Sequence, residues 1–359
     1  MPENHHVRRQ RLRSLLGPAE VDALLVTRLA NVRYLTGFTG SNAALLVTPD
    51  RTVLATDGRY TTQSEAQAPD VERVIDRACA EALTTLAGET GVRRLGFEEH
   101  DLSVATHATL RGRDRAPDLA VTGGLVERLR TVKDDGEIEL IRRACAISCH
   151  ALEQLLPVIA PGRTEREVAR DLENRMLDLG ADGVAFQTIV ATGPNSAIPH
   201  HRPTDREIAV GDLLKIDFGA LHHGYHADCT RTFVVGREPE TWQREIFDVV
   251  REAQRAGRRA LAPGAGLRQI DSAARDVVKS AGYGEQFSHG LGHGVGLEIH
   301  EAPALGCSAA GTISARTPVT VEPGIYLAGR GGVRIEDTLV VDESGPELLT
   351  TTPKDLLVL

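Results

Sequence analysis

The chain has 359 residues, of which 41% are hydrophobic and 25% are charged, so disordered, collagen-like and coiled-coil proteins are excluded. At roughly 150 residues per domain, this length predicts about two domains. The formal net charge of -9 argues against a broad nucleic-acid-binding surface, and no apolar run reaches the roughly 18 residues that span a bilayer. We therefore expect neither a nucleic-acid partner nor a membrane partner.

The first residues of the chain and the spacing of its cysteines bear on the cellular compartment of the protein. The basic segment at residues 5–13 is not followed by an apolar run of signal-peptide length. The cysteines are odd in number and lack CxxC spacing, which favours a reducing environment over a disulfide framework; they are Cys79, Cys145, Cys149, Cys229 and Cys307. We expect a cytoplasmic protein.

The first part of the chain, from Val21 to Glu99, alternates short apolar runs with polar segments compatible with helices. This pattern predicts an α/β domain. Its expected strands are Ala23–Val26, Ala43–Val47, Thr52–Ala55 and Leu95–Phe97, and its expected helices are Arg59–Gln67 and Arg77–Ala87.

The alternation breaks between Leu125 and Glu137, where Lys133–Gly136 resembles a polar linker. We expect a boundary near residue 130, between an N-terminal domain at residues 1–130 and a second domain at residues 131–359. The second domain mixes helices and strands without strict βαβ alternation, which predicts an α+β fold. Its expected helices are Glu137–Leu156, Glu165–Leu179 with a capping box at Thr164 and Glu167, Trp242–Leu261 and Leu267–Ser280; its expected strands are Leu213–Phe218, Thr230–Val235, Pro318–Val321 and Val333–Val341.

Two carboxylates interrupt sequence that should be buried. Asp217 lies in the apolar run Leu213–Phe218, and Asp228 follows eleven residues later, after the glycine-flanked connection Gly219–Gly224. Such a connection lets the two segments pair as a hairpin with both carboxylates close together. Because buried like charges repel, either one carboxylate is protonated or a cation lies between them.

A glycine-rich stretch supplies histidines. Between His289 and Leu297, glycine occupies every second position, and His293 and His300 lie within twelve residues of His289. This pattern disfavours a helix and leaves the backbone open to close approach by another group. Three histidines in this setting indicate a site rather than separate structural histidines.

Two further acids and an arginine follow. Glu322 ends an apolar run, and Arg334 and Glu336 are separated by one residue, so on a single strand they point to the same face. Together with Asp217, Asp228 and His293, these acids form a set of four carboxylates and one imidazole. Two divalent ions would balance that charge, and the oxygen-rich set favours Mn²⁺ or a similar hard ion over a structural zinc site. A two-metal site activates water and polarises a carbonyl, which is the chemistry of amide hydrolysis.

These motifs resemble the pita-bread-fold metallopeptidases, the group that contains proline-specific aminopeptidases, prolidases and methionine aminopeptidases. The stretch His289–Glu301 matches the proline-peptidase signature, and the four acids match in order and setting. Similar N-terminal motifs at Asn31–Gly40 and Thr56–Tyr60 extend the resemblance over nearly the whole chain. The resemblance implies a creatinase-like α/β N-terminal domain followed by an α+β pita-bread catalytic domain.

The resemblance also implies a metal-ligand set. Asp217 would bind one metal ion, while His293 and Glu322 would bind the other. Asp228 and Glu336 would bridge the two ions. Mn²⁺ is the expected metal, with Co²⁺ or Zn²⁺ as alternatives.

The remaining roles also follow from the resemblance. Glu322 would shuttle a proton to the leaving nitrogen, and Arg334 would support the ligands. His200 would contact the substrate near the scissile bond, with His201 as a rival for this role. His300 would stabilise the tetrahedral intermediate, and His289 would line the proline pocket.

The expected function is that of a metal-dependent Xaa-Pro aminopeptidase, a homodimer that acts on proline-containing peptides. An Xaa-Pro dipeptidase (prolidase) uses the same catalytic residues and stays open as an alternative. Three others are less favoured. A creatinase-like C–N hydrolase works without metal, although a metal-dependent hydrolase of another small amide stays open. A catalytically silent binding module lacks the ligands, and methionine aminopeptidase usually lacks the N-terminal domain.

Overall fold

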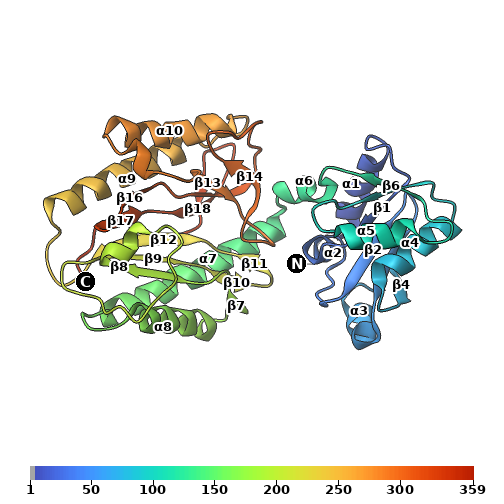
Figure 1. Ribbon diagram of the computed structural model, residues 1–359, viewed down its shortest axis with the longest axis horizontal. Coiled ribbons are helices and arrows are strands. Elements are labelled where there is room, and N and C mark those ends of the chain that lie inside the picture. The colour runs from blue at the N-terminus through green and yellow to red at the C-terminus, as the bar shows by residue number, and fades with distance from the viewer. Residues whose placement is uncertain (1–4) are drawn as a thin grey trace. The chain divides into compact units, whose positions relative to one another are not determined.

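The computed structural model describes residues 5–359, and the chain divides into two compact units, Met1–Arg130 and Thr131–Leu359 (Figure 1). Among the described residues, no helix combines the length and the apolar character needed to cross a bilayer.

The first unit is built on a six-stranded sheet in the order β4-β3-β2-β1-β5-β6. β1 pairs antiparallel with β2 and parallel with β5, and every residue of β1, β2 and β3 is buried. The strands are β1 Ala23–Val26, β2 Ala43–Val47, β3 Thr52–Thr56, β4 Glu72–Ile75, β5 Arg94–Phe97 and β6 Asp118–Val121. The helices are α1 His5–Leu16, α2 Leu29–Thr36, α3 Thr61–Gln67, α4 Cys79–Glu89, α5 Val104–Arg111 and α6 Leu125–Thr131.

The four strands predicted for this part of the chain are therefore confirmed, with ends that differ by at most one residue. The predicted helix Arg59–Gln67 divides into a 3₁₀ turn, Gly58–Tyr60, and α3. The turn forms because the Asp57 side chain accepts a hydrogen bond from the backbone N–H of Arg59, as Asx residues do at turns.

The second unit contains four sheets, in the orders β11-β10-β7, β12-β9-β8, β14-β13-β15-β18-β19 and β16-β17. Its strands are β7 Gly183–Val184, β8 Ile189–Thr192, β9 Leu213–Phe218, β10 Ala220–His222, β11 Tyr225–His226, β12 Cys229–Val234, β13 Gly292–Gly294, β14 Glu301–Leu305, β15 Pro318–Val321, β16 Gly324–Leu327, β17 Gly331–Arg334, β18 Asp337–Val340 and β19 Glu347–Leu348. Its helices are α7 Asp135–Leu155, α8 Glu165–Asp178, α9 Thr241–Ala260 and α10 Leu267–Ser280.

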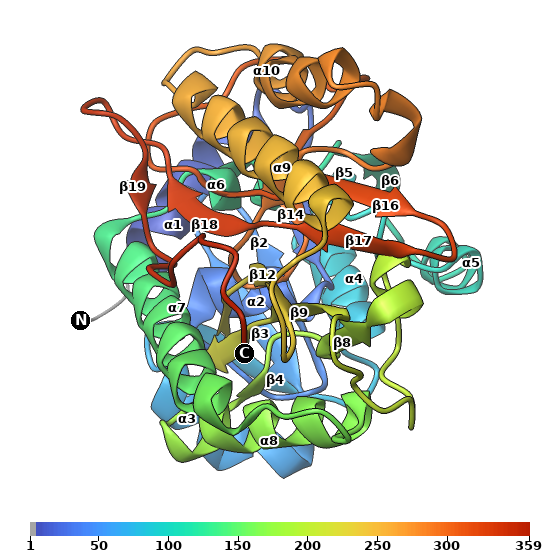
Figure 2. The ribbon, with the colours of Figure 1, turned by 90° about the vertical axis from the view of Figure 1, so that its left-hand side faces the viewer.

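Two helix pairs cover the strands of the second unit. α7 and α8 share one apolar core with β8, β9 and β12, while α9 and α10 share another with β15, β16, β17 and β18. Figure 2 shows these helix pairs on opposite sides of the strands. The layers agree with the predicted α+β fold of this part of the chain.

The segment Lys133–Gly136 is not the polar linker that its composition suggested. Lys133 is buried, and its Nζ lies 2.9 Å from Glu301 Oε2. Asp134 caps α7 in a capping box with Glu137. The interpretation failed because the partner of Lys133 comes from a distant part of the chain.

The predicted strand Val333–Val341 is also wrong as a single element. β17 ends at Arg334 and pairs with β16, whereas β18 begins at Asp337 and pairs with β15. Glu336 lies between the two strands, so it and Arg334 do not share a strand face. The predicted capping box at Thr164 and Glu167 is confirmed at the start of α8.

Candidate metal centre

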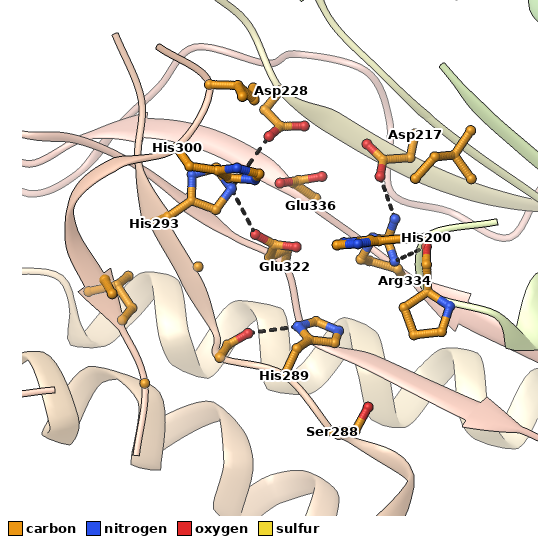
Figure 3. A pocket seen from close by; sticks show the side chains of 18 of the residues that line it. His200, Asp217, Asp228, Ser288, His289, His293, His300, Glu322, Arg334 and Glu336 are labelled. Atoms are coloured by element: carbon orange, nitrogen blue, oxygen red, sulfur yellow. Dashed lines mark hydrogen bonds and ion pairs between the residues drawn. The ribbon is translucent and has the colours of Figure 1, made fainter. Parts of the chain in front are cut away.

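All nine residues that the sequence analysis selected as catalytic or metal-binding line one cavity of about 910 Å³ in the second unit. Figure 3 shows that their side chains face a common space. They are His200, Asp217, Asp228, His289, His293, His300, Glu322, Arg334 and Glu336. His201, the rival of His200, lies at the same cavity.

The expected hairpin brings the first two acids together. β9 and β12 pair antiparallel, with Asp217 opposite Thr230 and Phe218 opposite Cys229. Asp228 directly precedes β12 and is buried. Because the two strands are fixed by this register, both carboxylates enter the cavity from the same sheet.

Asp228, His293 and Glu336 form a compact group of potential ligands. One donor atom from each residue lies within 4.8 Å of the others. His293 Nε2 also lies 3.6 Å from Asp228 Oδ2 and 3.3 Å from Glu322 Oε1. His293 Nδ1 lies 3.0 Å from the Gly294 carbonyl oxygen, which can only accept, so Nδ1 carries a hydrogen. Nε2 then faces the carboxylates, as the second ring nitrogen of a metal-binding imidazole does.

Two threonines orient these carboxylates. Thr230 Oγ1 donates to Glu336 Oε2 at 2.7 Å. Thr320 Oγ1 donates to Glu322 Oε1 and accepts from the His293 backbone N–H, each at 3.0 Å. Neither hydroxyl was predicted from the sequence. Their only signal is that each threonine lies two residues from an acid, Asp228 or Glu322.

The crowding of buried acids shifts the pKa values of their carboxyl groups. Burial, followed by the neighbouring carboxylates, raises the pKa of both Asp228 and Glu336 well above the ordinary range. Burial also acts to raise the pKa of Glu322, but the hydrogen bond from His293 and its charge outweigh burial and lower this pKa to about 2. Burial acts to lower the pKa of His293, yet Glu322 raises it overall.

Two carboxylate oxygens in this group lack a protein partner. Asp217 Oδ1 and Glu336 Oε1 are buried and accept no hydrogen bond from any described residue. A buried carboxylate oxygen without a partner is costly unless a cation contacts it. The four carboxylates and one imidazole therefore fit divalent cations, which this oxygen-rich donor set suits.

Arg334 is completely enclosed, and it contacts Asp217 rather than Glu336. Its Nη2 pairs with Asp217 Oδ2, its Nε donates to Thr230 Oγ1 at 3.0 Å, and its Nη1 donates to the Pro199 carbonyl oxygen at 3.2 Å. Arg334 was expected to support the ligands, and the carboxylate with which it pairs is Asp217, not the nearby Glu336. The guanidinium instead holds one oxygen of Asp217 and leaves Oδ1 open toward the cavity.

A hydrogen-bonded chain joins Arg334 to His289. Arg334 Nη1 donates to the Tyr326 hydroxyl at 2.8 Å, and that hydroxyl lies 2.9 Å from His289 Nε2. His289 Nδ1 lies 2.7 Å from the Gly290 carbonyl oxygen and must donate to it. His289 Nε2 therefore accepts from Tyr326, and burial lowers the pKa of His289. Tyr326, which follows Glu322 by four residues, was not predicted from the sequence to belong to the site.

The glycines of the histidine stretch permit close strand packing. A Cβ on Gly292 would lie 2.1 Å from the Thr320 carbonyl oxygen, and one on Gly294 would lie 2.3 Å from that of Ala302. The close approach expected from the sequence is thus made by neighbouring strands. This packing places His293 beside His300, whose ring centroid lies 4.4 Å away at an interplanar angle of 82°.

Comparison with known proteins agrees with this arrangement. Residues 139–343 match the model of metallopeptidase family M24, and residues 8–132 match that of the creatinase/prolidase N-terminal domain. The chain belongs to metallopeptidase family M24. The predicted family, the creatinase-like and pita-bread fold and the metal-dependent peptidase class are confirmed.

The relatives of this chain include proteins named as dipeptidases and a protein named as an aminopeptidase. An Xaa-Pro dipeptidase of Pyrococcus furiosus is 42% identical over 72% of this chain and 74% of its own length. The structure of an Xaa-Pro dipeptidase from Bacillus anthracis matches with a TM-score of 0.95 and 39% identity, covering 99% of this chain and 100% of that one. The structure of an X-Pro aminopeptidase from Thermotoga maritima matches with a TM-score of 0.90 and 36% identity, covering 98% and 99%.

Proposed function

We propose that this M24 chain is a dinuclear-metal exopeptidase that hydrolyses the bond between an N-terminal residue and proline. The observation that carries the proposal is the group of four carboxylates and one imidazole, in which two buried carboxylate oxygens have no hydrogen-bond partner among the described residues. In this proposal the second unit is catalytic. Asp217 would hold one ion, His293 and Glu322 would hold the other, and Asp228 and Glu336 would contribute to both.

Divalent ions held there lower the pKa of a coordinated water and polarise the scissile carbonyl. Mn²⁺ is the metal that we propose, because the donor set contains one nitrogen and no thiolate. The Asp217 carboxylate is already oriented as a ligand, since Arg334 pairs with Oδ2 and leaves Oδ1 without a partner.

Glu322 moves the proton in the proposed reaction. Its Oε1 is held by Thr320 and lies against His293, while the carboxylate borders the cavity. The side chain is ionised, so it can take a proton from the attacking water and deliver it to the proline nitrogen as the amide bond breaks.

Histidines complete the proposed substrate site. His200 and His300 are exposed to the cavity, where each ring can donate a hydrogen bond to an oxygen of the substrate at the scissile bond. His289 is held by Tyr326 and lies against the Phe287 ring, with centroids 5.1 Å apart. The His289 ring held in this way lines the cavity, where the ring of proline can pack against it.

The primary form of the proposal is an aminopeptidase that accepts peptides longer than two residues. The cavity of about 910 Å³ lies near the upper end of the range of roughly 300–1,000 Å³ for small-ligand pockets, which leaves room for residues beyond proline. The dipeptidase is the second candidate, because the relatives from Pyrococcus furiosus and Bacillus anthracis carry that name.

A matched pair of substrates tests both candidates. Metal-stripped protein is assayed on Xaa-Pro and Xaa-Pro-Xaa with and without Mn²⁺, beside Asp228→Ala and the exposed control Asp276→Ala. Metal-dependent cleavage of the tripeptide that is lost only in Asp228→Ala supports the aminopeptidase. Cleavage of the dipeptide alone supports the dipeptidase, and cleavage of neither by the metal-loaded protein refutes proline specificity.

The proposed setting is a cytoplasmic homodimer. All five cysteines are free, and four of them are buried, which suits a reducing compartment. The homodimer follows from the family resemblance and stays a prediction.

A further inference from the structure

Lysine is rare in this chain, and one of its lysines is buried beside the cavity. The sequence has 37 arginines and only four lysines, so a lysine enclosed in the fold marks a place where a compact ammonium suits better than a planar guanidinium. Lys215 lies on β9, two residues before Asp217, and has no exposed surface. The mechanism proposed above does not use it.

The amino group of Lys215 hydrogen-bonds to backbone carbonyl oxygens rather than to a carboxylate. Its Nζ donates to the Ile198 carbonyl oxygen at 2.7 Å and lies 3.3 Å from that of Pro199. It also lies 5.1 Å from the centroid of the Tyr326 ring. Because these hydrogen bonds join β9 to the segment that ends at His200, the side chain ties that segment to the strand that carries Asp217.

The two carbonyls belong to the residues that immediately precede His200. Among the described residues, none forms a hydrogen bond with the His200 ring, whereas the rings of His289 and His293 are both held. Figure 3 shows His200 beside Arg334 at the cavity. Because its ring is not tethered, its position depends on the backbone that carries it.

The other side of His200 is anchored by a second buried charge. Glu165, the first residue of α8, is fully buried. Its Oε2 lies 2.8 Å from His201 Nε2 and accepts from the Thr204 backbone N–H at 2.9 Å and from Thr204 Oγ1 at 2.7 Å. Burial opposes its ionisation, but these hydrogen bonds with that from Asn195 lower the pKa of Glu165 overall.

We propose that Lys215 is a positioning residue, which fixes the backbone before His200 while Glu165 fixes the backbone after it. The pair presents an untethered ring to the substrate carbonyl, and this role rests on the proposed function. A displacement of about 1 Å at a reacting group can cost about 100-fold in rate. Loss of the Lys215 contacts should therefore lower kcat far more than it changes KM.

A competing explanation is that Lys215 acts on Asp217 through its charge. The two side chains are separated by one residue on β9 and lie on the same strand face. Removing a cation beside a ligand would change metal affinity, whereas releasing the loop that carries His200 would not. Metal affinity therefore separates the two explanations.

The test uses Lys215→Met in the full-length, Mn²⁺-loaded protein, with Lys279→Met on the exposed face of α10 as the matched control. We expect a fall in kcat on the proline peptide of about 10- to 100-fold, a change in KM below about threefold, and an unchanged Kd for Mn²⁺. In a His200→Ala background the same substitution should cause no further loss of kcat, because Lys215 acts through His200. An equal loss in that background, or a tenfold change in Kd, would overturn the proposal.

Two further measurements keep the outcome decisive. If Lys215→Met does not fold, Glu165→Gln takes its place and should lower kcat in the same His200-dependent way. A crystal structure of either variant should show residues 198–204 displaced while Asp217 and Glu336 stay in place. If the wild type cleaves no proline peptide, the proposed function fails. The crystal structure of the variant then tests the positioning role by itself, because an unmoved His200 refutes that role.

Discussion

Glu336 offers the clearest test of the idea that the cavity is built around cations. Its side chain is buried, its Oε1 has no partner among the described residues, and its Oε2 accepts from Thr230. In Glu336→Gln the shape is kept but one of four crowded carboxylates is neutral. We therefore expect the metal-free variant to unfold at or above the melting temperature of the metal-free wild type.

The same substitution should remove most of the stabilisation by metal. An ion at 100 times its Kd stabilises the native state by about 2.7 kcal/mol. For a unit the size of Thr131–Leu359, each kcal/mol raises Tm by about 2–4 °C, so the wild type should gain about 5–11 °C. If loss of the Glu336 carboxylate weakens binding 100-fold, the gain falls to about 0.4 kcal/mol, or about 1–2 °C.

Differential scanning calorimetry of metal-stripped protein, repeated at one fixed Mn²⁺ concentration, measures both quantities. Glu343→Gln, at an exposed acid between β18 and β19, is the control and should behave as the wild type. A full Mn²⁺ shift in Glu336→Gln would refute the assignment of this carboxylate as a ligand. A metal-free variant that melts several degrees below the wild type would show that Glu336 is a structural acid instead.

Three other predictions concern charges at and away from the site. Arg334→Lys should lower kcat/KM by about 100-fold in metal-saturated protein, because an ammonium cannot hold Asp217 and the Pro199 carbonyl together; steady-state kinetics showing a loss below about threefold would contradict this. Asp337→Ala should lower the free energy of unfolding by about 3–5 kcal/mol in urea titrations, since it leaves the buried Arg231 without its carboxylate partner, and a cost below about 1 kcal/mol would argue against a structural pair. Burial raises the pKa of Glu98 from 4.5 to about 7, so the folded state binds this proton more tightly. The first unit should therefore lose up to about 3 kcal/mol of stability as pH rises from about 4.5 to about 7. Hydrogen exchange of α2 amides should show this fall in stability with rising pH in the wild type but not in Glu98→Gln. A pH dependence that the substitution leaves unchanged would refute the role of Glu98.

Most of the strands and helices that were predicted from local pattern lie where they were expected. β1, β2, β9, β15 and α10 have the predicted bounds, because apolar runs between turn residues report directly on burial. The ligand-type residues were also found from sequence, since a carboxylate inside an apolar run is unusual enough to need a reason. These features depend on neighbours within a few residues.

The errors share a different origin. Lys133 resembled a linker residue because Glu301, its partner, is far away in the sequence. Arg334 and Glu336 appeared to share a strand because nothing local shows that β17 and β18 join different sheets. Tyr326 and Lys215 gave no signal, since their roles come from contacts with His289 and with the backbone before His200.

We propose that two divalent ions in this cavity make the protein a peptidase. The most direct test of this claim is a titration of metal-stripped protein with Mn²⁺ in which calorimetric binding and hydrolysis of a proline peptide are followed on the same sample. Two ions per chain should bind, activity should rise as they bind, and Asp228→Ala should lose both. Full activity in the metal-stripped protein, or an Asp228→Ala variant that binds two ions and hydrolyses the peptide as the wild type does, would contradict the claim.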